Sequence, residues 1–484
     1  MSEPIVTTTE GAVRGRADGP AHVFRAIPYA ASPIGAARFA APAPHRPWPG
    51  VRDATRPGAT APQARRDGFG ALDMSPYFGP GWIRGEDYLT VDVWAPRHGS
   101  DHPVMVFVHG GGFVSGATRA PVSDGTAFAR DDVILVSVGY RLGVTGFLDV
   151  PGAPANRGLL DIMAALGWVQ RNIAAFGGDP DRVTLFGQSA GATLVTGVLA
   201  APAAAGLVHR AIVQSGNGLG AFTPEQGERV TRAAAAALGI ESTTAGFGAV
   251  PDEALVDLVP GLTGLDLRTA TDTDPLVGLS PFGLVLEEQP AHTFATGAAA
   301  EVALMIGTNA EEGNLYLVPQ GNLLTSTLDD VHALAARLHD DPRAWVDRYR
   351  SVRPEATVGQ VRSAMLGDAL FVEGSRRSAD AHRAHTRAST HTYEFGWRSP
   401  AVGGLLGAAH TVELPFVFDT VTLPELGGPR GMLGPTAAPA ELANRMHAAW
   451  TRFARTGDPG WEPEQVYRFT AGDQQVQGLR ATTP

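Results

Sequence analysis

Short apolar runs alternate with amphipathic stretches over the first half of the chain, and similar runs return later. Strands are predicted at residues 89–94, 104–108, 133–138, 183–186, 211–213, 302–306 and 390–395. Between the third and fourth runs, apolar residues recur at three- and four-residue spacing over 159–169, which predicts a helix. Strands that alternate with helices are typical of a mostly parallel sheet with helices on both faces. The pattern therefore predicts an α/β fold.

Two blocks rich in Ala and Leu interrupt this pattern. They cover approximately residues 222–300 and 328–384 and consist of helical segments separated by Pro and Gly. A strand-like run follows each block, so we interpret both as helical insertions between core strands that form cap or pocket regions. The chain has no internal repeat and no long low-complexity linker, so we expect residues 1–484 to form one unit.

The charge balance and two missing residue types exclude several functions. The chain has 38 basic and 49 acidic residues and a net charge of −11, which argues against binding to nucleic acids or anionic membranes. The sequence contains no Lys, so neither a Schiff-base lysine nor a P-loop lysine is available. Because Cys is also absent, disulfides, thiolate nucleophiles and Cys-ligated metals are excluded.

The longest stretch without a charged residue covers residues 183–208 and could suggest a membrane span. It contains Gln188, Thr193 and Pro202, so we interpret it as part of a buried helix. The first residues show no positively charged segment followed by an apolar one, and we therefore expect a cytoplasmic protein.

The apolar run at 183–186 leads directly into Gly187, Gln188, Ser189, Ala190 and Gly191. A serine on a sharp turn between a strand and a helix has a strained backbone and projects its hydroxyl group above the sheet. Small residues two positions before and after it avoid clashes, and the following helix adds the positive end of its dipole. This pattern predicts a nucleophile at Ser189, and the alternative is a structural turn rich in glycine.

A second glycine cluster follows the run at 104–108. After His109 come Gly110, Gly111 and Gly112, and glycines let backbone N–H groups point into a cavity. A serine that attacks a carbonyl group needs such donors for the developing oxyanion, each typically worth about 3 kcal/mol. We interpret the cluster as an oxyanion hole, and the alternative is a flexible turn.

These segments resemble the type-B carboxylesterase family of the α/β-hydrolase fold, which includes bacterial p-nitrobenzyl esterases and cholinesterases. The similar segments extend over nearly the whole chain, at residues 24–30, 86–94, 109–113, 140–143, 156–161, 176–180, 187–191 and 450–459.

The resemblance implies a catalytic triad in the order serine, acid, histidine. It assigns the acid to Glu312, with the adjacent Glu311 at a non-catalytic position, and the histidine to His410. His109 is the competing base, but it precedes Ser189 and matches the oxyanion segment instead.

Further roles follow from the same resemblance. The amides of Gly111, Gly112 and Ala190 are expected to hold the oxyanion, and Ser215 is expected to lie behind the acid and the histidine. Glu413, close to His410, is interpreted as structural.

The chain also departs from many relatives. A disulfide there joins positions that are Ala61 and Tyr88 here, so the loop between them is untethered. In the family this loop can line the mouth of the substrate gorge, and here it carries the aromatic residues Phe69, Tyr77, Phe78 and Trp82. Glu86 and Arg141 match positions that form an ion pair in relatives, and we expect the same pair here.

The resemblance implies a serine carboxylic-ester hydrolase that acts through an acyl-enzyme on small to medium uncharged esters. Neither a metal nor an organic cofactor is expected. Two alternatives stay open: hydrolysis of amides or carbamates by the same triad, and a non-catalytic binding protein. The expected partner is a small-molecule ester, and the oligomeric state, monomer or homodimer, is not determined.

Overall fold

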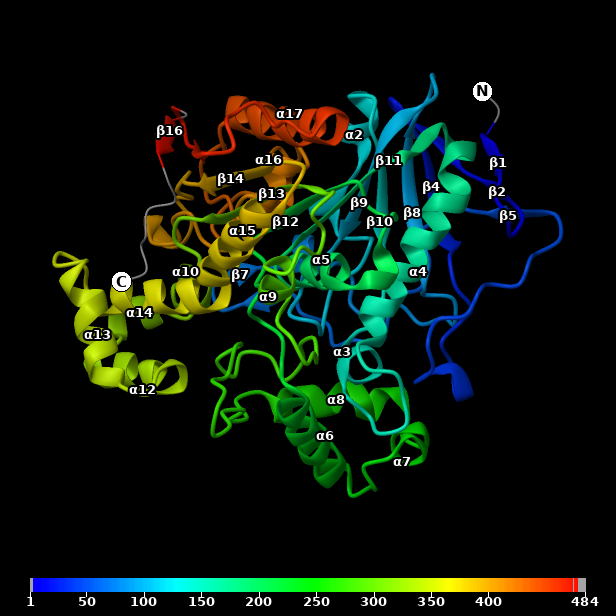
Figure 1. The fold of residues 1–484 in the computed structure, drawn as a ribbon. Helices are drawn as coiled ribbons and strands as arrows, with labels where there is room; N and C mark the ends of the chain where they lie inside the picture. Colours follow the sequence, from blue (N-terminus) through cyan, green and yellow to red (C-terminus); the bar gives the residue numbers. More distant parts are fainter. Residues whose placement is uncertain (1–2, 473, 478–484) are drawn as a thin grey trace.

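The computed structural model describes residues 3–472 and 474–477, and its centre is a sheet of eleven strands (Figure 1). In spatial order the strands are β16 (Gln474–Gln477), β15 (Gln465–Phe469), β14 (Thr390–Phe395), β13 (Ala303–Asn309), β12 (Arg210–Gln214), β11 (Gly178–Gln188), β9 (His102–Val108), β10 (Ile134–Val138), β8 (Thr90–Pro96), β4 (Ala21–Pro28) and β3 (Arg16–Asp18). From β15 to β10 the strands run parallel, and antiparallel strands extend both ends. The predicted α/β fold is confirmed.

Each of the seven predicted apolar runs forms a strand of this sheet. The outer strands β3, β4, β15 and β16 were not predicted, because polar and charged side chains interrupt their apolar residues. Two small sheets also escape the pattern: β1 (Ile5–Thr7), β2 (Ala12–Arg14) and β5 (Val51–Asp53) form one, and β6 (Gly68–Phe69) and β7 (Leu72–Asp73) form the other.

The central strands are buried on both faces of the sheet. In β9, Val104 and Val106 belong to one hydrophobic cluster, whereas Met105 and Phe107 belong to the other, as expected for side chains that alternate along a strand. Helices α4 (Arg157–Asn172) and α5 (Ala190–Ala200) complete the first cluster. Helices α2 (Thr126–Arg130) and α17 (Ala440–Thr456) complete the second.

The predicted helix at 159–169 lies within α4, and the uncharged stretch 183–208 forms the end of β11 and the buried helix α5. None of the helices in the described part of the chain is both long and apolar enough to cross a membrane. Further short helices are α1 (Ser75–Phe78), α3 (Gly143–Phe147), α10 (Asn314–Leu317), α11 (Asn322–Thr325) and α16 (Leu414–Val417).

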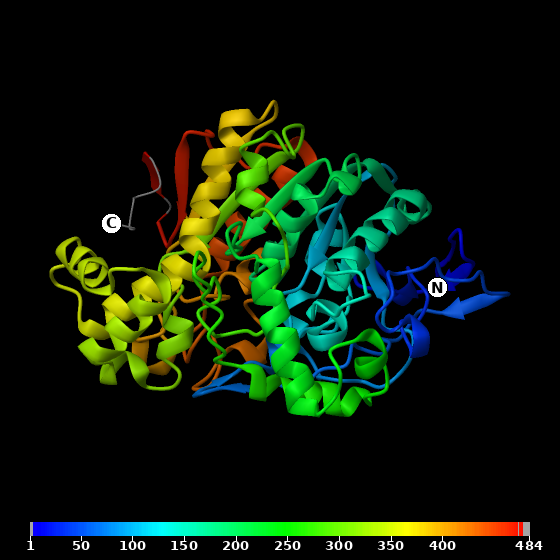
Figure 2. The ribbon, with the colours of Figure 1, turned by 60° about the horizontal axis from the view of Figure 1, so that its bottom comes forward.

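The Ala- and Leu-rich blocks form helices that lie mainly below the sheet in Figure 1 and come forward in Figure 2. The first block contains α6 (Pro224–Leu238), α7 (Thr244–Gly248), α8 (Asp252–Leu262) and α9 (Pro290–Phe294). The second contains α12 (Leu328–Leu338), α13 (Pro342–Ser351), α14 (Val358–Gly367) and α15 (Glu373–His385). Both blocks return to the core, because α9 contacts α5 and α15 contacts β13 and β14. The division into one unit with two cap insertions stays a prediction.

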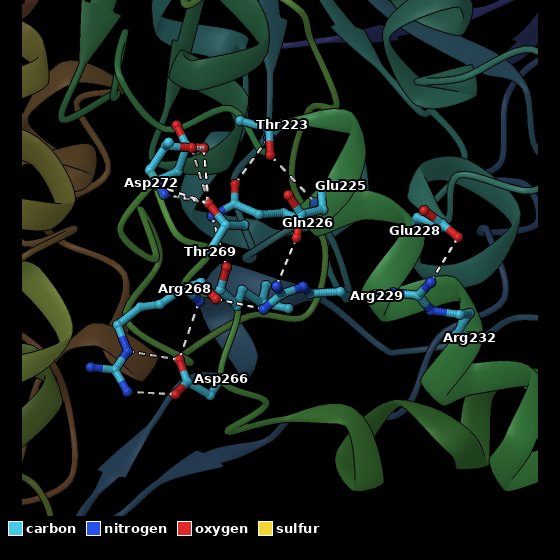
Figure 3. Close-up of polar contacts among 12 residues, drawn as sticks. Thr223, Glu225, Gln226, Glu228, Arg229, Arg232, Asp266, Arg268, Thr269 and Asp272 are labelled. Carbon is cyan, nitrogen blue, oxygen red and sulfur yellow. Dashed lines mark hydrogen bonds and ion pairs between the residues drawn. The ribbon is translucent and has the colours of Figure 1, made fainter.

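Polar contacts fix the loop after α8 against the beginning of α6 (Figure 3). Thr223 and Gln226 form a capping box at the start of α6. Gln226 also donates a hydrogen bond to the carbonyl oxygen of Thr273 at 2.8 Å, and Arg229 donates to that of Arg268 at 2.5 Å. The loop therefore has a defined position where it continues toward the cavity described below.

A buried ion pair joins the segment after β10 to α4. The side chains of Arg141 and Asp161 are both fully buried, and two hydrogen bonds of 2.6 and 2.8 Å connect guanidinium and carboxylate. Arg141 also donates to the carbonyl oxygen of Ala40 at 2.6 Å. The predicted pair between Arg141 and Glu86 is wrong, because Glu86 is exposed and the carboxylate of Asp161 takes the partner position.

We expect Asp161→Asn to lower the free energy of unfolding by about 3–5 kcal/mol, because it leaves a buried guanidinium without a counter-charge. Glu86→Gln, the matched control, should change the same quantity by no more than about 0.5 kcal/mol. Chemical denaturation of the three proteins measures both values. Equal effects of the two substitutions would contradict the assignment of the pair.

Candidate active site

Ser189 occupies a sharp turn between β11 and α5. Its backbone angles are φ 59° and ψ −128°, a conformation that residues with a side chain rarely adopt. A methyl group at Gly187 would lie 2.6 Å from the backbone of Gly191, and one at Gly191 would lie 2.1 Å from the carbonyl oxygen of Val108. The turn therefore requires glycine at both positions, which explains the spacing seen in the sequence.

A continuous chain of hydrogen bonds leads from this serine to a carboxylate. The Nε2 atom of His410 lies 2.8 Å from Ser189 Oγ, and its Nδ1 atom lies 2.7 Å from Glu312 Oε2. Glu312 follows β13, and His410 lies in the loop before α16. Both side chains are almost completely buried. The structure thus brings the three predicted triad residues together.

The second oxygen of Glu312 has two further donors. Ser215 Oγ donates to Glu312 Oε1 at 2.6 Å, and the backbone amide of Asn309 donates to the same atom at 2.7 Å. Ser215 directly follows β12 and has a φ of 51°. Ser215 therefore lies behind the acid, where the resemblance suggested it.

The two competing residues contact other parts of the chain. Glu311 forms an ion pair with Arg398 and accepts a hydrogen bond from the amide of Ala408 at 2.9 Å. The His109 ring is stacked on Tyr140 with 4.4 Å between centroids. Burial lowers the pKa of His109 to about 4, so it is neutral near pH 7. Neither side chain forms part of the Ser189–His410–Glu312 chain.

The glycine segment after β9 lies beside the serine. A methyl group at Gly110 would be 3.1 Å from Ser189 Cβ, and one at Gly111 would be 1.9 Å from the carbonyl oxygen of Ser115. Gly111 and Gly112 have positive φ angles of 113° and 64°. Both, like Ala190, line the cavity that contains Ser189. The three residues therefore border the same cavity as the serine, which is the position that an oxyanion hole requires.

This cavity, which we call the serine cavity, has a volume of about 180 Å³ and mostly apolar walls. Phe69, Tyr77 and Phe78 of the untethered loop line it, as the resemblance suggested, whereas Trp82 lies under the guanidinium of Arg84. The aromatic groups suit apolar parts of a substrate.

One aromatic residue that contacts the histidine was not predicted from the sequence. The Phe371 ring is stacked on the imidazole of His410, with 4.0 Å between centroids and 13° between planes. It lies in a π-helical turn, Asp368–Val372, between α14 and α15. The apolar spacing of this segment predicts only helix, so the wider turn that directs Phe371 toward His410 has no signal in the sequence.

Glu413 is a second buried carboxyl group behind the histidine. Its Oε2 atom accepts a hydrogen bond from Asn309 Nδ2 at 2.6 Å, and its Oε1 atom has no partner among the described residues. Burial, together with the charge of Glu312, raises the pKa of Glu413 to about 7. Glu413 does not contact Ser189 through a hydrogen bond in the described structure, which agrees with a structural position.

Comparison with known proteins gives one consistent result. The family model described as "Carboxylesterase family" matches residues 2–483. The chain is 35% identical to para-nitrobenzyl esterase of Bacillus subtilis over 96% of its own length and 92% of that protein. It is 34% identical to phenmedipham hydrolase of Pseudarthrobacter oxydans, over 98% of its own length and 95% of that protein. A solved carboxylesterase of Geobacillus stearothermophilus aligns with a TM-score of 0.83 and 32% identity, over 98% of this chain and 97% of that chain.

The raised pKa of Glu413 predicts a pH-dependent stability. Below pH 4.5, the ordinary pKa of Glu, the group is protonated in both the folded and the unfolded states. Above that pH the unfolded state releases the proton first, so the contribution of Glu413 to the free energy of unfolding is lost as the pH rises through about 7. Glu413→Gln mimics the protonated acid and should not show this loss. The difference in free energy of unfolding between the variant and the wild type should therefore shift by about 2 kcal/mol in favour of the variant when the pH is raised from about 5 to about 8. Denaturation at both pH values, with Glu311→Gln as the control, measures this. A difference that is independent of pH would contradict the assignment.

Proposed function

The chain belongs to the carboxylesterase family, and we propose that it hydrolyses carboxylic esters with Ser189 as nucleophile, His410 as base and Glu312 as orienting acid. The observation that supports this proposal most strongly is the hydrogen-bond chain of 2.8 and 2.7 Å from Ser189 through His410 to Glu312. A serine hydroxyl is a weak nucleophile near neutral pH and needs an adjacent base.

The reaction follows from the roles of these atoms. With a proton on Nδ1 that is donated to Glu312, the Nε2 atom of His410 is free to accept the hydroxyl proton of Ser189. Ser189 Oγ then attacks the ester carbonyl carbon, and the imidazolium returns the proton to the leaving alcohol. Water attacks the resulting acyl-enzyme in the same way, which releases the carboxylate and restores the serine.

The developing negative charge needs donors that are already in place. We assign this role to the backbone amides of Gly111, Gly112 and Ala190, which border the serine cavity. The amide of Ala190 also belongs to the first turn of α5, where the helix dipole is positive. No step of this reaction requires a metal or an organic cofactor.

The serine cavity supports small to medium uncharged esters as substrates, since its walls are mostly apolar. The same residues could in principle cleave amides or carbamates, and no contact in the site favours that reaction. The binding-protein alternative does not explain the hydrogen-bond chain. A cytoplasmic location is also part of the proposal, and the cysteine-free sequence supports it.

Ser189→Ala is expected to lower kcat/KM for p-nitrophenyl acetate, butyrate and octanoate at least about a thousandfold, because it removes the nucleophile. Release of p-nitrophenolate measures the rates, and the preferred chain length reports the size of the acyl site. The matching 4-nitroacetanilide tests the amide alternative. Unchanged ester hydrolysis in the folded variant would refute the proposed nucleophile.

Ser215→Ala should lower kcat by only about tenfold and leave KM unchanged, because Glu312 loses one hydrogen bond but keeps those from Asn309 and His410. Steady-state kinetics with p-nitrophenyl butyrate separates the two constants. A loss as large as that of Ser189→Ala, or a change confined to KM, would show that Ser215 does not act through the orientation of Glu312.

A further inference from the structure

Arg66 is a partly buried cation on the wall of the serine cavity. It also lines a neighbouring cavity of about 480 Å³ between the untethered loop, α3 and α8. Phe69, Leu279 and Ser280 are shared by both walls, so Arg66 lies where the two cavities adjoin. A substrate longer than the serine cavity would pass this side chain.

The segment that carries Arg66 is fixed to the oxyanion segment. The side chain of Gln63 accepts a hydrogen bond from the amide of Gly116 at 2.8 Å and donates to its carbonyl oxygen at 2.9 Å. Arg66 follows three residues later, and its Nη1 atom lies 3.4 Å from Ser115 Oγ. The guanidinium group is therefore held close to the glycine segment and not at a freely moving tip.

Other buried arginines show how this fold normally compensates such charges. Arg141 has the carboxylate of Asp161, and Arg157 donates four hydrogen bonds to backbone carbonyl oxygens. In the described part of the chain, no carboxylate lies within ion-pair distance of Arg66, and its only hydrogen bond is the long one to Ser115. Burial lowers the pKa of Arg66, which reflects the cost of desolvating its charge.

Two aromatic rings cover the guanidinium group without neutralising it. Its central carbon lies 4.9 Å from the centroid of Phe78 and 6.0 Å from that of Phe69. Such cation–π contacts use the flat faces of a guanidinium and leave the N–H groups at its edge for other acceptors. The edge of Arg66 matches the two oxygens of a carboxylate.

The walls of the serine cavity contain no Asp or Glu among the described residues, although the protein has a net charge of −11. The neighbouring cavity contains Asp252, but that carboxylate is paired with Arg38 at 2.7 Å. Arg65 also lines the neighbouring cavity, but it is paired with Asp67. An anionic group near Arg66 would thus meet one unpaired cation and no unpaired acid on these walls. A cationic group there would be repelled by Arg66 and would find no unpaired carboxylate.

From this geometry we propose that Arg66 binds a carboxylate carried by the substrate, so that half-esters and other carboxylate-bearing esters are substrates in addition to uncharged ones. This inference rests on the proposed ester hydrolysis. Water cleaves the acyl C–O bond of a half-ester and yields a dicarboxylate, an alcohol and a proton, while the carboxylate at Arg66 is unchanged. Arg66 then determines specificity without touching the reacting atoms.

The experiment compares two matched substrate pairs that differ by one carboxylate. In the first pair, mono-(4-nitrophenyl) adipate carries the carboxylate on the acyl side, and 4-nitrophenyl hexanoate is its uncharged counterpart. In the second pair, 4-acetoxybenzoate carries the carboxylate on the alcohol side, and phenyl acetate is its uncharged counterpart. The proteins are the wild type, Arg66→Gln, Arg66→Lys and the control Arg84→Gln. Arg84 lies on the same loop but is exposed, and its partner is Glu253.

We expect Arg66→Gln to lower kcat/KM at least about tenfold for one or both carboxylate-bearing esters, because a charge-assisted hydrogen bond is lost. The uncharged esters should change by no more than about twofold. Arg66→Lys keeps the charge but loses the planar fork of N–H donors, so its preference for the charged esters should lie between those of the wild type and Arg66→Gln. Arg84→Gln should behave as the wild type.

An equal loss on charged and uncharged esters would overturn the inference and make Arg66 a support for the oxyanion segment through Ser115. Hydrolysis of uncharged esters without any effect of Arg66 on the charged ones would overturn it as well, while leaving the proposed function intact. If the folded wild type hydrolyses no ester, the proposed function itself fails. Should Arg66→Gln not fold, the inhibition of the wild type by benzoate is compared with its inhibition by benzamide, the neutral isostere. Tighter binding of benzamide than of benzoate would contradict the inference.

Discussion

The backbone conformation of Ser189 is the constraint on which the rest of the site depends. A positive φ at a residue with a side chain costs on the order of 1–3 kcal/mol and persists only where the surroundings enforce it. Here Gly191 approaches the carbonyl oxygen of Val108 so closely that a side chain would collide with it, which packs the start of α5 against the end of β9. The amide of Ser189 also donates to the carbonyl oxygen of Gln214 at 2.9 Å. Burial of α5 in the first hydrophobic cluster offsets the strain at Ser189 and directs its hydroxyl group into the cavity.

Neighbouring strands then supply the remaining polar groups at the same edge of the sheet. Ser189 follows β11, Ser215 follows β12, and Asn309 ends β13, and these strands lie side by side and run parallel. Their apolar runs could be predicted from the sequence because strands buried on both faces need continuous hydrophobic residues. The triad candidates could be predicted too, since the turn at Ser189 requires small residues at fixed spacing and the family resemblance covers the segments of Glu312 and His410. The sequence pattern does not show that four separate segments of the chain meet within hydrogen-bond distance, and only the folded structure shows this.

Other features could not be predicted because they depend on long-range packing. Asp161 replaces Glu86 as the partner of Arg141, and a carboxylate in the helix α4 carries no sign of which guanidinium it will meet. Phe371 reaches His410 only because a π-helical turn rotates it out of the regular helical spacing. The position of Arg66 has the same origin, since Arg65, its neighbour in sequence, forms an exposed pair with Asp67. Adjacent arginines thus have different surroundings, and only the folded loop distinguishes them.

The two carboxyl groups behind His410 show how the fold selects which one carries charge. Glu312 has three donors, from Ser215 Oγ, the amide of Asn309 and the His410 ring. Glu413 has one side-chain donor, Asn309 Nδ2, and an oxygen without a partner in the described structure. Hydrogen bonds stabilise the charged form of a buried carboxylate, whereas burial without them favours the neutral form. Glu312 therefore has the donors that an ionised carboxylate needs, and its Oε2 atom lies against Nδ1 of His410, whose ring becomes positive when Nε2 accepts a proton. With Glu413 largely protonated below its pKa of about 7, the imidazolium faces one counter-charge and not two. A second ionised carboxylate there would stabilise the imidazolium further and make return of the proton to the leaving group less favourable.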